Sequence, residues 1–196
     1  MVTITRDSYW LVKLSKLRVD RARGDPAPHK PLLRLAICDL AEQGDLPEVV
    51  PLSPELAFRF YTYWSIVAKR RPQRPDVRLP FHHLAGDGVW SVLDEQGHPS
   101  PDRRMTRFAK LPSDLIAFLE DPATREKARH LLIAKYFRPP EQIALYAMIG
   151  LPVPSRQEIE QNATYESPEE AQMAGREARF RIRVVTAYNY TCALTA

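Results

Sequence analysis

Residues 78–90 read RLPFHHLAGDGVW, and the organisation predicted for the chain is built around this stretch. Leu79-Pro80 predicts a stiff, extended approach, because proline fixes its own φ and pushes the preceding residue towards extended backbone. Gly86-Asp87-Gly88 predicts a turn, and the sequence VWSVL at 89–93 predicts a β-strand. We therefore expect a turn and a strand that present apolar side chains next to a basic run, which suits binding better than catalysis.

The composition sets wide limits. The chain has 196 residues, 44% of them hydrophobic, and a net charge of +4, so an anionic partner is plausible but not required. Eighteen prolines against seven glycines indicate short helices that begin at prolines and are joined by stiff loops. Cys38 and Cys192 form neither a disulfide framework nor a zinc motif, which fits a reducing cytoplasm. We find no signal peptide and no run long enough to span a membrane.

Helical periodicity and capping signals dominate the chain. The helix expected at 31–43 is apolar nearly all round and should lie in the centre of the core. Near the N-terminus, Trp10, Leu14 and Leu17 form one apolar stripe. The expected helices are 6–20, 31–43, 54–69, 113–120, 122–137, 141–149 and 167–186. The fold class predicted is mainly α with a small β element (α+β), a compact multi-helix domain.

Several groups of cations could meet an anionic partner. His29 and Lys30 stand at the start of the core helix, where free N–H groups and the helix dipole attract anions. The alternative is that both are solvated loop residues. The five cations of residues 13–23 are most simply interpreted as a solvated helix face.

Two further basic clusters flank the central stretch. In residues 69–78 five cations accompany one acid, and we expect an exposed loop that contacts phosphates, the alternative being a solvated loop. The cations predicted to contact the DNA backbone or bases are Arg70, Arg71, Arg74, Arg103 and Arg104.

Catalytic motifs are missing from the sequence. His82 and His83 are adjacent, so on an extended backbone they point to opposite sides and make a poor metal pair. The sequence has no phosphate-cradling glycine loop, nucleophile elbow or dinucleotide fingerprint. We predict no catalytic residue, no metal site and no cofactor for this chain.

Two motifs carry a resemblance to a known family. The sequences PHKPLL at 28–33 and PFHHL at 80–84, the latter followed by DGVW at 87–90, resemble the sulfur-binding domain of bacterial type IV restriction endonucleases. Those domains bind double-stranded DNA whose backbone carries a phosphorothioate. The resemblance covers roughly residues 25–95.

The resemblance implies a set of DNA- and sulfur-binding residues: His29, Lys30, Arg78, Leu79, Pro80, His82 and His83. The apolar sulfur pocket of the family is built around a proline, which corresponds to Pro80. This sequence departs from some members in carrying Lys30 in place of Arg, Leu79 in place of an aromatic residue and His83 in place of a small residue. These departures concern the shape of the pocket and its sequence preference.

The C-terminus resembles the opening of an HNH nuclease domain. Arg179-Phe180-Arg181, Tyr188 and residues 192–195 match that opening, although Ala196 stands where Gly is usual. The sequence ends before any nuclease histidine, so the chain as given should not cut DNA. We expect a sulfur-binding domain at 1–152, a helical linker at 153–187 and the start of an HNH domain at 188–196. A divalent metal would be expected for the nuclease domain alone.

The physical basis of sulfur recognition is plain. Sulfur is larger and more polarizable than oxygen and accepts hydrogen bonds weakly, so an apolar pocket favours it and disfavours a hydrated oxygen. A cation such as Lys30 would hold the anionic group. Two alternatives stay open: a general or differently modified DNA-binding module, and a protein-interaction domain that docks a partner on Leu79, Phe81 and Trp90.

Overall fold

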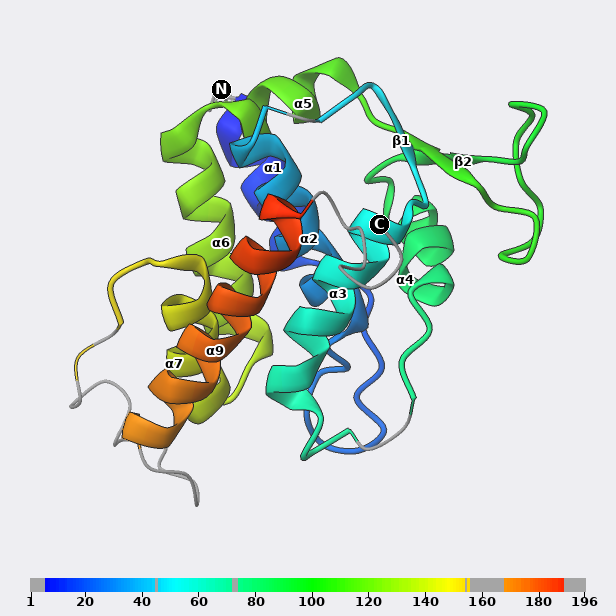
Figure 1. The fold of residues 1–196 in the computed structure, drawn as a ribbon. Helices are drawn as coiled ribbons and strands as arrows, with labels where there is room; N and C mark the ends of the chain where they lie inside the picture. Colours follow the sequence, from blue (N-terminus) through cyan, green and yellow to red (C-terminus); the bar gives the residue numbers. More distant parts are fainter. Residues whose placement is uncertain (1–5, 45, 72–73, 154, 156–167, 189–196) are drawn as a thin grey trace. The chain divides into compact units, whose positions relative to one another are not determined.

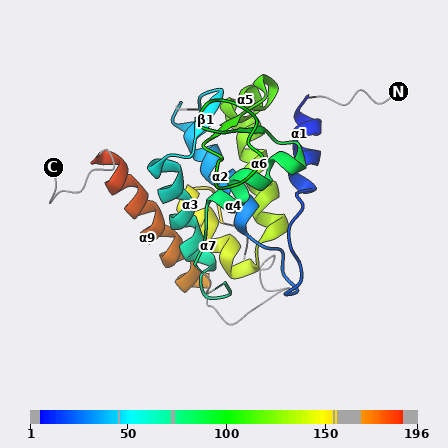
Figure 2. The same cartoon turned by 90° about the vertical axis from the view of Figure 1, so that its right-hand side faces the viewer.

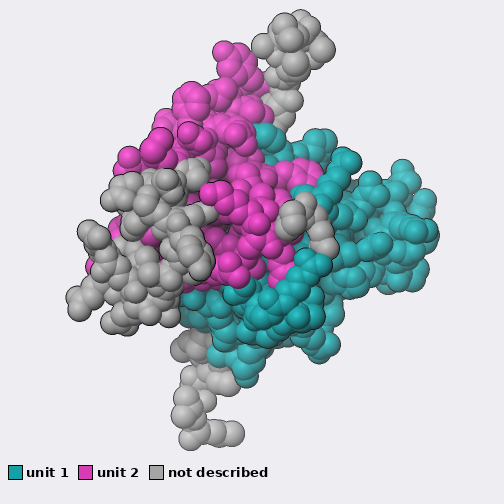
Figure 3. All heavy atoms as spheres, turned by 90° about the horizontal axis from the view of Figure 1, so that it is seen from below, with its two compact units in different colours: residues 1–60, 74–136 teal, residues 61–73, 137–196 magenta. Residues whose placement is uncertain are grey.

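The computed structural model describes residues 6–44, 46–71, 74–153, 155 and 168–188. Helices dominate, and a small antiparallel sheet accompanies them, so the predicted α+β class is confirmed (Figure 1). The chain divides into two compact units, residues 1–60 with 74–136 and residues 61–73 with 137–196, which Figure 3 colours separately. The predicted boundaries at 152 and 187 differ from these units and stay predictions.

The first unit is centred on helix α2 (His29–Glu42). Helices α4 (Arg78–His83), α5 (Ser113–Glu120) and α6 (Pro122–Tyr136) all pack on it. Its apolar residues are buried almost without exception, as the sequence predicted for a central helix. Arg34 is also fully buried in this helix, which the sequence did not predict.

Helix α1 (Arg6–Ser15) packs against α5 and α6, and Figures 1 and 2 both show α1 beside α6. It ends five residues before the predicted residue 20, but the predicted stripe is correct, since Trp10, Leu14 and Leu17 are all buried. The Tyr136 hydroxyl donates to the carbonyl of Leu14 at 2.9 Å and accepts the N–H of Leu17 at 3.1 Å. These bonds anchor the end of α1 on α6.

The sheet has the order β1-β3-β2, formed by β1 (Val49–Pro51), β3 (Phe108–Lys110) and β2 (Ser91–Leu93). Its central row, Val50↔Ala109↔Val92, is buried on one face. Pro51 lies on the edge strand β1, where its missing N–H breaks no bond between central strands. The strand predicted at 89–93 is therefore present but shorter.

The second unit pairs helices α7 (Pro139–Ile149) and α9 (Pro168–Ala187). A Cβ at Gly175 of α9 would lie 2.0 Å from the carbonyl oxygen of Ala144 in α7. Glycine is therefore required for this close helix contact. Ile143 and Ala144 form a small apolar cluster with Ile66 and Val153. Helix α3 (Pro54–Val67) contributes its first half to one unit and its second half to the other.

Within the described parts of the chain, none of the helices combines the length and the apolar character needed to cross a membrane. Among the same residues, no three His, Cys, Asp or Glu side chains gather in a way that could hold a metal ion.

Candidate nucleic-acid interface

The central stretch folds as a helix where the sequence predicted extended backbone. Leu79 and Pro80 lie in α4, which continues into the 3-10 turn η1 (Ala85–Asp87). Pro80 is compatible with the helix because it stands in the first turn, where N–H groups have no acceptor within the helix. The carboxylate of Asp76 accepts the backbone N–H of Arg78, the first residue of α4, at 3.0 Å.

The helix also changes the relation between the two histidines. Their rings lie 5.3 Å apart at an interplanar angle of 80°, so they do not point to opposite sides. His82 Nδ1 lies 2.7 Å from the Oγ1 of Thr106, which is itself buried. His83 is exposed at the end of the helix. His82 therefore links α4 to the loop before β3, and His83 faces outward.

Trp90 packs against α4 and holds it in place. Its indole N–H donates to the carbonyl of Phe81 at 3.0 Å, and the two rings lie 5.5 Å apart. Phe81 and Trp90 are 0% and 4% exposed. The alternative in which they dock a protein partner is therefore wrong for these two residues, because both belong to the core.

Arg34 of α2 is buried next to Trp90. Its guanidinium carbon is 5.8 Å from the centre of the Trp90 ring, and its nitrogens have no hydrogen-bond partner among the described residues. Burial lowers the pKa of Arg34 to about 10. The side chain is thus a buried cation at neutral pH, stabilised in part by the face of the indole. Arg34 stands in a helix that is apolar nearly all round, and nothing in the sequence indicated that its guanidinium is buried.

Lys30 extends from the first turn of α2 to Asp87 at the end of η1. Its ammonium lies 2.6 Å from Asp87 Oδ2, and the two side chains are 14% and 4% exposed. Asp87 is therefore more than a turn residue, since it holds the cation that the sequence analysis placed beside the bound anion. The flanking glycines gave no signal of this contact, which depends on residues 57 positions apart.

The side chain of His83 interacts electrostatically with Lys30 and with Arg103, which belongs to the loop between β2 and β3. Partial desolvation of the ring, followed by the positive charges of His82, Lys30 and Arg103, lowers the pKa of His83, and Asp87 opposes the shift. The structure thus brings four residues, His82, Lys30, Arg103 and Asp87, within interaction range of His83. All of these except Asp87 had been predicted as site residues, as had His83 itself. A neutral imidazole at the surface offers an amphipathic contact surrounded by cations.

The remaining predicted site residues fall into two groups. Arg74, Arg78 and Arg104 are exposed, His29 and Leu79 are half-buried, and Pro80 is buried. Arg70 and Arg71 lie in the second unit, and neither is exposed. Arg70 Nη2 donates to Glu141 Oε2 at 3.0 Å, and Arg71 is 6% exposed. The prediction that the whole run 69–78 is exposed is therefore wrong at Arg70 and Arg71, because a distant acid and local packing cover them.

The first unit therefore presents an exposed histidine and the edge of Leu79 within a field of lysines and arginines. A basic surface that surrounds a small apolar spot is typical of a module that binds a polyanion.

Part of the chain matches a known family. Residues 68–153 match the family model described as ScoMcrA-like, DNA sulfur-binding domain. The resemblance to sulfur-binding domains is thus confirmed for this part of the chain, which includes α4, the β2–β3 loop and helices α5 to α7. None of the curated proteins matches the sequence.

Two solved structures are similar to the chain. One is the sulfur-binding domain of ScoMcrA complexed with phosphorothioated DNA, which is 25% identical, covers 65% of this chain and 87% of its own, and has a TM-score of 0.47. The other is the type IV phosphorothioation-dependent restriction endonuclease ScoMcrA, which is 26% identical with the same TM-score. The match covers 65% of this chain but 29% of that enzyme.

Proposed function

We propose that this chain binds double-stranded DNA that carries a phosphorothioate in its backbone, and that the exposed end of α4 together with the first turn of α2 receives the sulfur. The observation that carries the proposal is the position of His83. It is exposed, lies within the fields of Lys30 and Arg103, and belongs to a region that matches the DNA sulfur-binding family.

The chemistry of the site supports sulfur over oxygen. Leu79 and the neutral ring of His83 offer polarizable, weakly hydrated surface, with which sulfur gains dispersion energy. A phosphate oxygen in the same place would lose hydrogen bonds to water without regaining them. The surrounding cations hold the anionic backbone, which both duplexes share, so discrimination comes from the apolar spot and affinity from the charges.

Exposed cations provide the backbone contacts. Arg74, Arg78, Arg103 and Arg104 are the candidates among the predicted residues. The backbone of Arg104 is held in place, because its N–H donates to Asp102 Oδ1 at 2.9 Å and its carbonyl accepts from Arg107 Nη1 at 2.7 Å. Arg70 and Arg71 would contribute little, because their guanidinium groups are not free to approach a duplex from a buried position.

The experiment is a titration of two otherwise identical duplexes, one with a single Rp phosphorothioate and one without, over a panel of base contexts at near-physiological salt. We expect tighter binding to the modified duplex, and we expect Leu79→Ser and His83→Ala to reduce the ratio of the two affinities more than either affinity for plain DNA. Lys127→Ala, on the exposed side of α6, is the matched control and should change neither.

Equal binding of both duplexes by the wild-type protein would contradict the sulfur proposal and favour the general DNA-binding function, which the exposed arginines also support. A steep decrease of affinity with salt would accompany that result.

We further propose that the sulfur-binding module directs a nuclease. The support is the resemblance of residues 179–195 to the opening of an HNH domain. Residues 179–188 belong to α9 and its end, and residues 189–196 lie outside the described residues. A divalent metal is expected for that nuclease alone. Fusion of an HNH nuclease domain to the C-terminus of this chain should give cleavage of modified DNA that depends on a divalent metal and on the sulfur. Equal cleavage of modified and plain DNA by the fusion would contradict this proposal.

A further inference from the structure

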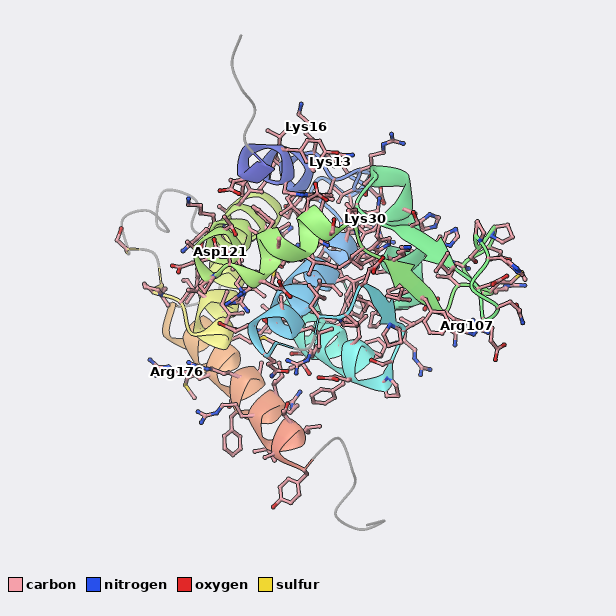
Figure 4. All side chains as sticks on the ribbon, turned by 90° about the horizontal axis from the view of Figure 1, so that it is seen from above. Lys13, Lys16, Lys30, Arg107, Asp121 and Arg176 are labelled. Carbon is pink, nitrogen blue, oxygen red and sulfur yellow. The ribbon has the colours of Figure 1, made fainter. Side chains whose placement is uncertain are left out.

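A second group of cations lies on α1 and the residues that follow it, outside the region that matches the family. Lys13, Lys16 and Arg18 lie within the six residues 13–18. Figure 4 shows Lys13 and Lys16 projecting from α1, with Lys30 on α2 below them. Lys16 and Arg18 are exposed, and the Arg18 side chain is 82% exposed.

Contacts with the turn after α4 hold this segment in place. Lys13 Nζ donates to the carbonyls of Asp87 and Gly88 at 3.3 and 3.4 Å. The backbone N–H of Arg18 donates to Asp87 Oδ1 at 3.3 Å. Gly88 has a φ of +67°, and a Cβ at this position would lie 2.5 Å from Lys13 Nζ. The glycine thus permits both the turn and the close approach of the lysine.

The same carboxylate serves the two basic groups. Asp87 Oδ2 pairs with Lys30, and Asp87 Oδ1 accepts from Arg18. The cations of α1 are thereby fixed beside the cation at the start of α2. The cluster contains four cations and one carboxylate, and the carboxylate is 4% exposed while Lys16 and Arg18 face solvent.

These side chains border a hollow. Its volume is about 260 Å³, and it is lined by Tyr9, Val12, Lys13, Lys16, Arg18 and Asp87. One water molecule takes about 30 Å³ of liquid, so the hollow has room for a phosphate group with part of its hydration. Lys13 lies 5.7 Å from the centre of the Tyr9 ring, which keeps its ammonium at the wall of the hollow.

We infer that this hollow is a second, sequence-independent binding site for an unmodified phosphate of the same DNA duplex, contacted by Lys16 and Arg18. The inference rests on the proposed binding of DNA and adds a contact surface to it. One DNA strand presents a phosphate about every 3.4 Å along the helix axis, so a backbone held near Lys30 brings further phosphates to the neighbouring cations. Because Lys16 and Arg18 would contact the backbone and no sulfur, they add affinity without discrimination.

The test is the salt dependence of DNA binding by the double variant Lys16→Ala/Arg18→Ala. Each phosphate contact contributes about 0.9 to the slope of log K against log salt concentration. We expect the slope to decrease in magnitude by about 1 to 2, with equal weakening on the modified and the plain duplex. Both side chains are exposed, so the variant should keep the thermal stability of the wild type.

Two controls sharpen the test. Lys127→Ala also removes an exposed cation from the first unit and should leave the slope unchanged. Inorganic phosphate, added at constant ionic strength, should not displace the duplex at low millimolar concentration. Displacement at that concentration, reversed in the double variant, would assign the hollow to a free anion and overturn the inference.

The outcomes separate this inference from the proposed function. A strong sulfur preference with an unchanged slope in the double variant would overturn the second site and leave the sulfur proposal standing. Equal binding of the two duplexes with a reduced slope would do the reverse. Failure of the wild-type protein to bind either duplex at low salt would overturn both.

Discussion

The basic run at 69–78 and the basic residues at 13–30 differ in how far their charged groups are exposed to solvent. In the first region, Arg70 is held by Glu141, with both side chains 9% exposed. In the second, Asp87 takes up Lys30 but leaves Arg18 82% exposed. From the sequence alone we favoured the first region as a DNA contact and interpreted the cations of α1 as a solvated helix face. Density of charge along a sequence is therefore a poor guide to exposed charge, because a single distant acid can bury one cation and orient another.

The largest expected effect is the loss of stability that follows when the ion pair of the first region is broken. Arg70→Ala leaves the carboxylate of Glu141 buried and without its guanidinium, and removing one partner of a buried pair costs about 3–5 kcal/mol. We expect the free energy of unfolding, measured by urea denaturation, to decrease by that amount. The matched control, Arg74→Ala, changes an exposed arginine of the same run and should stay within about 0.5 kcal/mol of the wild type. An equally small change in the free energy of unfolding for both variants would mean that the pair of Arg70 with Glu141 does not stabilise the fold.

Asp87→Asn tests the second region. The amide retains hydrogen-bonding capacity but loses the charge that holds Lys30, so we expect a loss of about 1–3 kcal/mol in the free energy of unfolding. The same change releases the ammonium of Lys30 and removes a negative charge, so affinity for a plain duplex should rise several-fold. Fluorescence anisotropy measures this rise, and unchanged or weaker binding would contradict the role of Asp87 as the counter-ion of Lys30.

Arg34 provides a contrast to both regions, since this buried cation has no carboxylate partner among the described residues. Replacing it with methionine removes a desolvated charge and keeps an elongated side chain against Trp90. We expect the free energy of unfolding to increase by about 1–2 kcal/mol. Thermal and urea denaturation measure the change. A loss of stability would show that stacking on the indole outweighs the cost of burying the guanidinium.

The smallest expected effect is on pH dependence. The pKa of His83 in the folded chain lies below the ordinary value of 6.5, so the unfolded chain binds the proton more readily. Stability from this group is therefore complete above about pH 6.5 and decreases as pH falls towards the lowered pKa.

Protonation of His83 should also reduce the preference for sulfur, because an imidazolium favours a hydrated oxygen as much as it favours sulfur. The ratio of affinities for the two duplexes should fall between pH 7.5 and pH 5.5. His83→Gln cannot titrate at this position and should make the ratio independent of pH. A ratio that changes equally in the variant would assign the effect to another group.

Much of the fold could be predicted because its signals are local. Helices α2, α5, α6 and α7 lie within two residues of their predicted bounds, since prolines, caps and apolar periodicity mark their ends. Helix α4 was missed because Leu79-Pro80 favours extended backbone in isolation. In the folded chain Pro80 stands where no helical N–H is needed, and Trp90 supports the helix through the carbonyl of Phe81.

The candidate site was predicted in its residue types and only partly in its geometry. His83, Lys30 and Arg103 come from three separate segments, and no periodicity of the sequence relates their positions. Asp87 was interpreted as part of a turn because the sequence Gly-Asp-Gly is by itself typical of a turn. Its contacts with Lys30 and Arg18 join residues 57 and 69 positions apart, and they become visible in the folded chain alone.

The sequence by itself determined the helical class, the central helix and the motifs that resemble the sulfur-binding family, because these depend on side-chain type and short-range spacing. The tertiary structure decided which cations are available to an anion. Packing buried Arg34 and Arg71, paired Arg70 with Glu141, and left Lys16, Arg18 and His83 at the surface. The physical reason is that the cost of removing a charge from water depends on the neighbours that replace the water, and those neighbours are set by contacts distant in the chain.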